Sequence, residues 1–145
     1  MRNNRHLVHR SRYEDYVNKF TQRAAALKVG DPDDPTTNIV PVINGKQKSK
    51  IMNLIQQLVE QGAKITTCGY SRGLVIEPTV MRDVTKDQPV AQNEIFGSVI
   101  PIIAFDSDEE AMDLANGTPF GLSGSVHSQD LQSIHCSLWC RDRNE

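Results

Sequence analysis

The chain has 145 residues, of which 18 are acidic and 16 are lysine or arginine, so its formal net charge is −2. This length suits one domain with a buried core, and so balanced a charge gives no electrostatic reason to expect nucleic acid or an anionic membrane as a partner. The longest apolar run, residues 99–105, is far shorter than the roughly 20 residues that a membrane helix needs.

Two features of the sequence indicate a compartment. The basic residues 1–6 are followed by no apolar segment of the kind that a secretory signal contains. The chain has three cysteines, which give no disulfide framework and suit a reducing environment. We therefore expect a cytoplasmic protein.

The first predicted elements are a short buried strand over residues 6–9 and a helix. Apolar residues recur at helical spacing from Tyr13 to Leu27, with Ser11 as the expected N-cap and an end near Val29 and Gly30. Residues 30–37 contain two prolines, which cannot continue a helix and predict a turn-rich connection.

A second helix is predicted from residue 46. Ile51, Leu54, Ile55 and Leu58 follow the spacing of one buried face, and Gly62 suits the left-handed position just past a helix end. Residues 63–67 then predict a strand, residues 68–73 a turn, and residues 74–80 extended structure interrupted at Pro78.

The most apolar segment, residues 99–105, predicts a buried strand. Ser107 and Glu110 form a capping box that starts a helix, and Asn116-Gly117 ends it. Residues 122–127 predict one more strand. Strands that alternate with helices in this way predict an α/β fold with a mainly parallel sheet and helices on both faces.

The loop before that apolar strand carries a carboxylate and an aromatic ring, Glu94 and Phe96, followed by Gly97. One interpretation is a surface loop with a solvated Glu and a core Phe, which follows the usual burial of these residues. The other is a binding site, and neighbouring motifs favour it.

Four motifs occur in a characteristic order: Pro78-Thr79-Val80, Asn93-Glu94-Ile95-Phe96-Gly97, Glu109-Glu110-Ala111 with Ala115-Asn116, and Phe120-Gly121-Leu122-Ser123. With them the chain resembles the NAD(P)-dependent aldehyde dehydrogenases. The resemblance covers residues 1–131 and the later part of the family's catalytic domain, so it implies an incomplete α/β domain of that kind. Residues 132–145 lack the pattern, and we expect a non-native tail from an interrupted reading frame, which the neighbouring DNA would test.

The resemblance implies oxidation of an aldehyde to a carboxylic acid. In the family a Cys thiolate attacks the carbonyl, hydride passes to nicotinamide, and a Glu-activated water hydrolyses the thioester. That nucleophile lies immediately upstream of the segment that begins here with Met1, and the base Glu and the dinucleotide-binding fold also lie upstream. We therefore expect no catalytic residue in this chain and no activity from the chain alone.

The resemblance also implies cofactor contacts at four residues. The family's Glu at the position of Glu94 holds the nicotinamide ribose hydroxyls, since a carboxylate accepts two hydrogen bonds at once. The aromatic at Phe96 packs near the nicotinamide. Gln47 and Lys50 match positions near the ribose, although a solvated helix face also favours such side chains. The cofactor is NAD or NADP, bound weakly or not at all by this chain, because the residues that distinguish them lie upstream.

Three residues depart from the family's pattern. Val40 stands where the family usually has Gly, Asn93 where it has a second Glu, and Ser98 where it has Pro. Losing the Gly alters the turn expected around Val40. Losing the Pro frees the loop that carries Glu94.

The remaining candidates for chemistry are cysteines and histidines. Cys68 lies in a predicted turn with no sequence neighbour that would activate a thiol, so we do not expect a nucleophile there. His127, His135, Cys136 and Cys140 have a spacing unlike the common structural zinc sites, so we predict no metal.

Three hypotheses for the function remain open. The chain is an incompetent fragment of an enzyme for aromatic or other bulky aldehydes, or a non-catalytic interaction module that pairs with itself or with full-length relatives through open sheet edges. Alternatively, it is one piece of a split enzyme whose partner brings the Cys and the dinucleotide-binding fold. In each case an aldehyde is a substrate only of a complete enzyme.

Overall fold

The computed structural model describes residues 5–88, 94–119 and 123–130. Its elements, in chain order, are β1 (His6–His9), α1 (Arg10–Ala25), α2 (Gly45–Glu60), β2 (Lys64–Thr67), β3 (Ser71–Arg72), β4 (Val75–Ile76), β5 (Thr79–Arg82), β6 (Val99–Phe105) and α4 (Asp108–Asn116). None of the helices in these ranges is both long and apolar enough to cross a membrane.

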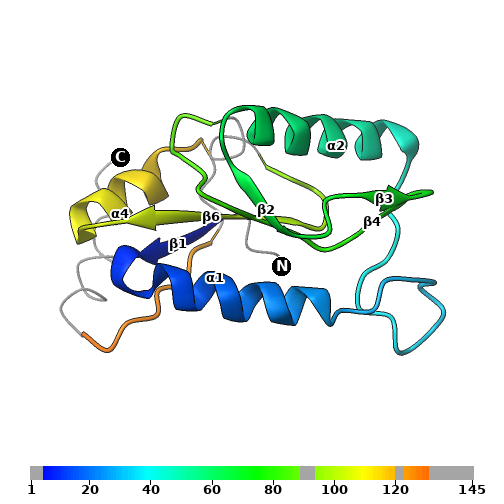
Figure 1. Cartoon of the computed structure of the whole chain (residues 1–145), viewed down its shortest axis with the longest axis horizontal. Coiled ribbons are helices and arrows are strands. Elements are labelled where there is room, and N and C mark those ends of the chain that lie inside the picture. Colours follow the sequence, from blue (N-terminus) through cyan, green and yellow to red (C-terminus); the bar gives the residue numbers. More distant parts are fainter. Residues whose placement is uncertain (1–4, 89–93, 120–122, 131–145) are drawn as a thin grey trace.

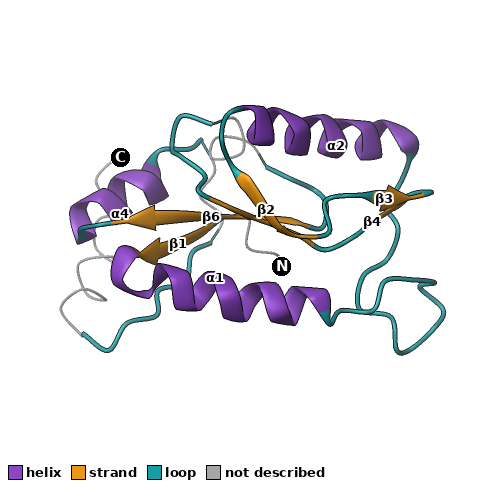
Figure 2. Ribbon diagram, in the orientation of Figure 1, coloured by secondary structure: helices purple, strands orange, loops and turns teal. Residues whose placement is uncertain are grey.

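The main sheet has four strands in the order β1-β6-β5-β2, and β3 and β4 form a separate two-stranded hairpin. Strand β6 is parallel to both of its neighbours, with His6 opposite Ile102 and Thr79 opposite Val99. Only β2, at one edge, is antiparallel. Helix α1 covers one face of this sheet and α2 the other (Figures 1 and 2). The predicted mainly parallel α/β architecture is confirmed.

Each face of the sheet has its own apolar core. Val99 and Ile103 of β6 pack with residues of α2 and α4, whereas Ile102 packs with residues of α1. This division follows from the strand itself, since successive side chains point to opposite faces. The apolar run 99–105 is therefore continuous in the sequence because both faces of β6 are covered.

Helix α1 departs from its prediction at both ends. Its N-cap is His9, whose Nδ1 accepts the Ser11 backbone N–H at 3.2 Å, so Ser11 lies inside the helix. The helix ends at Ala25 rather than near Val29, because Val29 forms a parallel bridge with Ile39 instead. The bridge between Val29 and Ile39 therefore stands where the last turn of the helix was predicted.

The other two helices have the predicted caps. The Ser107 hydroxyl accepts the Glu110 N–H at 3.2 Å, and Gly62 after α2 has φ +99°. The Glu110 carboxylate reaches back to the backbone N–H of Asp106 rather than to that of the N-cap, at 2.7 Å. The strand predicted over 122–127 is absent from residues 123–127, which are exposed and irregular, and residue 122 lies outside the described part.

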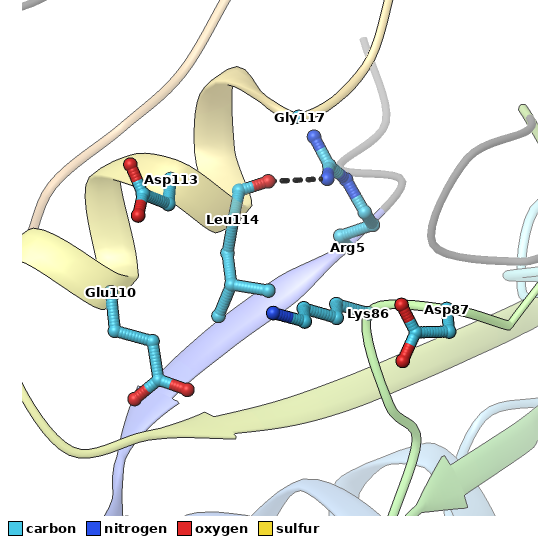
Figure 3. A pocket seen from close by; sticks show the side chains of 7 residues that line it. All are labelled: Arg5, Lys86, Asp87, Glu110, Asp113, Leu114 and Gly117. Atoms are coloured by element: carbon cyan, nitrogen blue, oxygen red, sulfur yellow. Dashed lines mark hydrogen bonds between the residues drawn. The ribbon is translucent and has the colours of Figure 1, made fainter.

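Arg5 joins the start of β1 to the C-terminal end of α4. Its guanidinium donates to the Leu114 carbonyl at 2.8 Å (Figure 3). It also donates to the Ala115 carbonyl at 3.2 Å and to the Thr118 hydroxyl at 3.3 Å. Helix α4 has no basic residue in its own last turn. Arg5 therefore supplies from a distant strand the positive charge that a helix C-terminus favours.

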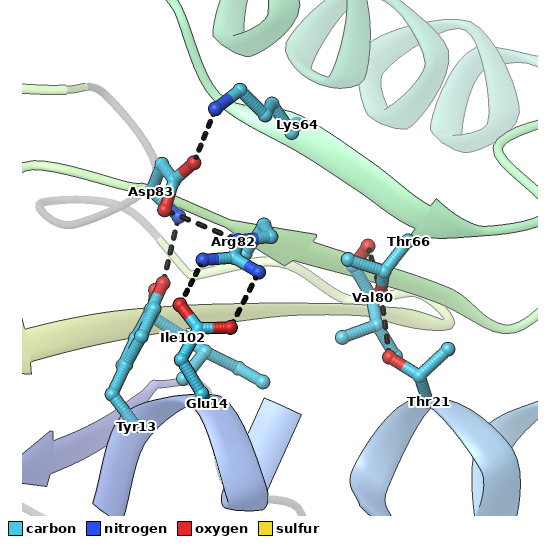
Figure 4. Close-up of polar contacts among 9 residues, drawn as sticks. All are labelled: Tyr13, Glu14, Thr21, Lys64, Thr66, Val80, Arg82, Asp83 and Ile102. Atoms are coloured by element: carbon cyan, nitrogen blue, oxygen red, sulfur yellow. Dashed lines mark hydrogen bonds and ion pairs between the residues drawn. The ribbon is translucent and has the colours of Figure 1, made fainter. Parts of the chain in front are cut away.

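A polar cluster holds α1 against the sheet (Figure 4). Arg82 of β5 pairs with the Glu14 carboxylate, with one nitrogen at 3.0 Å, and Lys64 of β2 pairs with Asp83 at 3.0 Å. The Tyr13 hydroxyl accepts the Asp83 N–H at 2.8 Å and donates to the Ile102 carbonyl at 3.3 Å. The hydrogen bonds from Arg82 lower the pKa of Glu14.

We expect the stability of the fold to decrease with falling pH in two ranges. Burial lowers the pKa of His6 from its ordinary 6.5, so the folded state binds this proton less readily than the unfolded chain. The contribution of His6 is complete above pH 6.5 and is lost as the pH falls toward its folded pKa, by at most about 1.4 kcal/mol per pH unit. The stabilisation by the ion pair between Arg82 and Glu14 is lost as the pH falls below 4.5 toward the lowered pKa of Glu14.

Urea unfolding at several pH values checks this expectation. In the variant His6→Gln the free energy of unfolding should no longer change between pH 6.5 and the pKa that His6 has in the folded wild type. Its decrease below pH 4.5 should remain. An unchanged profile in that variant would contradict the assignment to His6.

We expect Arg5→Met to lower the free energy of unfolding by about 1 kcal/mol, because it leaves the last carbonyls of α4 without their charged donor. Arg12→Met, at an exposed position of α1, is the matched control and should change it by less than about 0.5 kcal/mol. Chemical denaturation of both variants measures the difference, and equal effects would show that the cap contributes nothing.

Candidate functional site

The loop that leads into β6 is attached to α2 by two buried residues. Ile95 belongs to the same core as Ile51 of α2. Gly97 is buried against Ile51 so closely that a Cβ placed on it would overlap the Ile51 Cδ1 atom. The Ser98 carbonyl accepts the Thr79 N–H at 2.7 Å, which ties the loop to β5. The position of Ser98 is thus held by a backbone hydrogen bond even without the family's Pro.

Because Ile95 and Gly97 are buried, the residues that alternate with them, Glu94 and Phe96, face outward. Glu94 is exposed, and Phe96 is 69% exposed. The interpretation of Phe96 as a core residue is therefore wrong, because the core position in this loop is taken by Ile95. A carboxylate and an aromatic ring lie two residues apart on a loop with a fixed backbone.

Helix α2 brings a third predicted residue to this loop. The Gln47 side chain donates from Nε2 to the Phe96 carbonyl at 3.2 Å. Gln47 is itself held in the first turn, where its N–H donates to the Asn44 side chain at 2.9 Å. Lys50 lies one helical turn further on and is exposed. The structure thus brings Gln47 to the backbone of the loop that carries Glu94 and Phe96, with Lys50 next along the same side of α2.

The N-terminal end of α2 is basic, whereas the loop beside it carries the exposed Glu94 carboxylate. The first turn of α2 contains no acidic residue, and Lys46 and Lys48 lie there. The N-terminus of a helix already carries a partial positive charge, to which these lysines add. Nothing in this arrangement is a nucleophile, so the chemistry that it offers is binding and orientation.

The other candidates are not at this loop. Cys68 is exposed in a turn with φ +51°, and the Thr67 hydroxyl donates to its Sγ at 3.4 Å. His127 is exposed, whereas His135, Cys136 and Cys140 lie outside the described residues, as does the predicted tail over 132–145. Within the described ranges no group of three His, Cys, Asp or Glu side chains is placed to hold a metal ion.

A cavity of about 380 Å³ opens elsewhere, between β1, α4 and the chain after β5 (Figure 3). Its lining mixes both signs of charge, and the Arg5 guanidinium at its wall is engaged by α4. Burial lowers the pKa of Arg5. Neither this cavity nor a shallower one of about 230 Å³ on α2 includes any of the four predicted cofactor residues.

Sequence reasoning missed the residues that position the site. In the sequence Gly97 is only one member of a motif, whereas in the structure its contact with Ile51 sets how closely the loop approaches α2. Asn44 caps the helix that carries Gln47, and the Asn-Gly pair before a helical pattern is a signal that could have shown this.

Comparison with known proteins identifies the family of this chain. The family model described as the aldehyde dehydrogenase family matches residues 1–138. Benzaldehyde dehydrogenase YfmT of Bacillus subtilis (strain 168) is 43% identical over 129 residues, which are 89% of this chain and 27% of that protein. The chain therefore spans about a quarter of the length of the curated relatives that it matches.

Solved structures agree in fold. Succinate-semialdehyde dehydrogenase from Burkholderia pseudomallei superposes with a TM-score of 0.91 at 32% identity, covering 95% of this chain and 29% of that one. A Mycobacterium tuberculosis aldehyde dehydrogenase complexed with NAD+ gives a TM-score of 0.88 at 38% identity, with 94% and 29% covered. The chain belongs to the aldehyde dehydrogenase family.

Proposed function

We propose that this chain forms the nicotinamide-facing part of an NAD(P)-dependent aldehyde dehydrogenase. In that reaction an aldehyde is oxidised to a carboxylic acid, water supplies the added oxygen, and NAD(P)+ becomes NAD(P)H with release of a proton. The observation that carries the proposal is the pair of outward-facing side chains, Glu94 and Phe96, on a loop whose intervening residue is buried beside α2.

The described residues fit one end of the cofactor. The exposed Glu94 carboxylate can accept hydrogen bonds from both ribose hydroxyls, and the exposed Phe96 ring offers a flat apolar surface for nicotinamide. Gln47 holds the loop backbone through its Nε2, which leaves its amide oxygen able to accept a hydrogen bond from the ribose, and the exposed Lys50 lies one helical turn further along α2. When bound, the nicotinamide would accept the hydride of the reaction.

The thiol, the base and the dinucleotide-binding fold belong, on this proposal, to the part of the enzyme that the chain does not span. On this proposal the chain alone does not catalyse aldehyde oxidation, and it binds the cofactor weakly. We propose aromatic or other bulky aldehydes as substrates of the complete enzyme, a proposal supported by the name of the Bacillus subtilis relative. Solved relatives bind both dinucleotides, since the Mycobacterium tuberculosis structure is complexed with NAD+ and a 3,6-anhydro-L-galactose dehydrogenase with NAP, so the proposal is for NAD or NADP.

We expect nicotinamide mononucleotide to bind the purified chain with a Kd in the millimolar range, about −4 kcal/mol, because only the nicotinamide and its ribose have contacts here. AMP, which lacks the nicotinamide, should show no saturable binding. Ligand-observed saturation-transfer NMR measures both.

The variant Glu94→Gln tests the ribose contact. It should weaken nicotinamide mononucleotide binding by about tenfold, because a charged acceptor is replaced by a neutral one. Glu109→Gln, at an exposed position in the first turn of α4, is the matched control and should not change it. Equal affinity of the wild type and the Glu94 variant would refute the assigned role.

We expect Gly97→Ala to lower the free energy of unfolding by about 1–3 kcal/mol, because the added methyl group must displace Ile51 from a packed core. It should also abolish detectable nicotinamide mononucleotide binding, since the loop must shift away from α2. Gly45→Ala adds the same methyl group where nothing lies within 4 Å and should leave both properties unchanged. Denaturation and NMR titration compare the two variants.

A further inference from the structure

Gln88 is the only buried residue with a side-chain amide in the ranges that the structure describes. It is 4% exposed, and the other buried polar or charged residues of these ranges are Glu77 and Thr79. Gln88 lies in the connection between β5 and β6, six residues before Glu94. An amide that is removed from water in this way destabilises a fold unless its oxygen and its nitrogen both find partners.

Both ends of the Gln88 amide have a backbone partner. Its Oε1 accepts the Thr85 N–H at 3.2 Å, and its Nε2 donates to the Gln61 carbonyl at 3.2 Å. These partners fix the orientation of the amide, because a flipped group would place its NH2 against an N–H and its oxygen against a carbonyl. The side chain of Gln88 is therefore a specific link between two backbone segments.

This link ends on the C-terminal end of α2. Gln61 is the C-cap of that helix, and its carbonyl is one of the last carbonyls, which have no partner within a regular helix. Val84, which follows β5, belongs to the same apolar core as Leu58 of α2. The chain after β5 is thus joined to the end of α2 by a hydrogen bond and by a shared core.

The same helix holds the other end of this connection. Gln47, in the first turn of α2, donates to the Phe96 carbonyl at 3.2 Å. Glu94 therefore comes between two attachments to α2, one at Gln88 and one at Phe96. Because a helix is rigid, it can fix the two attachments relative to each other, and the loss of either one frees one side of Glu94.

We infer that Gln88 is a positioning residue for the Glu94 carboxylate, which it holds in place through the hydrogen bond to the C-terminal end of α2. The inference rests on the proposed function, since it takes Glu94 as the residue that meets the nicotinamide ribose. It adds that the affinity of this site depends on a buried amide at the end of α2 opposite to Gln47.

The variant Gln88→Met tests this role, because it keeps an unbranched side chain of similar length and removes both amide groups. We expect the backbone amides of residues 95–98 to exchange hydrogen about tenfold faster, because the loop opens locally while the sheet stays folded. The amides of Ile102 and Ile103 in β6 should keep the wild-type rate. Gln57→Met, at an exposed position near the same end of α2, is the matched control and should change neither rate. NMR measures the exchange.

The affinity for nicotinamide mononucleotide is the second measurement. We expect Gln88→Met to weaken binding about fivefold in the otherwise wild-type chain and to have no further effect in the Glu94→Gln variant, because it acts through that carboxylate. The variant Gln88→Glu keeps an oxygen for the Thr85 N–H and removes the donor to the Gln61 carbonyl. It should speed exchange in the same loop, so the role remains testable if Gln88→Met does not fold.

Three results would overturn the inference. They are wild-type exchange of residues 95–98 in Gln88→Met, equal acceleration in this loop and in β6, and further weakening of binding by Gln88→Met in the Glu94→Gln variant. The exchange measurement needs no ligand, so it separates the two proposals. Faster loop exchange in a chain that does not bind nicotinamide mononucleotide supports the positioning role and refutes the proposed function. Binding that Gln88→Met leaves unchanged supports the function against the positioning role.

Discussion

Strand β6 is the constraint on which the rest of the structure depends. It is the only strand of the described sheet with parallel neighbours on both sides, and its alternate side chains enter the cores under α1 and under α2. A strand covered on both faces cannot slip by one residue without moving every side chain to the opposite core. Its start at Val99 is therefore fixed, and so is the loop that precedes it.

The candidate site follows from that fixed start. Ile95 and Gly97 extend the packing of β6 onto α2, which turns Glu94 and Phe96 outward and brings Gln47 to the loop backbone. The backbone of this loop is held by a buried neighbour and by a residue of a capped helix, so a ligand would not need to order it.

Prediction from the sequence was accurate where local signals and tertiary packing agree. The second helix, the strand over 99–105 and the cap at Ser107 have strong periodicity or capping chemistry of their own. Prediction failed where the secondary structure of a segment depends on whether another segment pairs with it. Residues 26–30 have helical spacing, but Val29 pairs with Ile39; residues 123–127 have the composition of a strand without a pairing partner in the described sheet. Strand formation depends on such a partner, which a local pattern does not contain.

The sequence by itself determined the α/β class, the family resemblance and the chemical types at the site, because periodicity and ordered motifs are properties of the chain. It did not determine that Phe96 is outside and Ile95 inside, that Gln47 meets Phe96, or that Arg5 caps α4 across 109 residues of sequence. The two contacts join residues far apart in the chain, and the burial of Ile95 depends on the helix that packs on it. Only the packing of helices on the sheet decides these features.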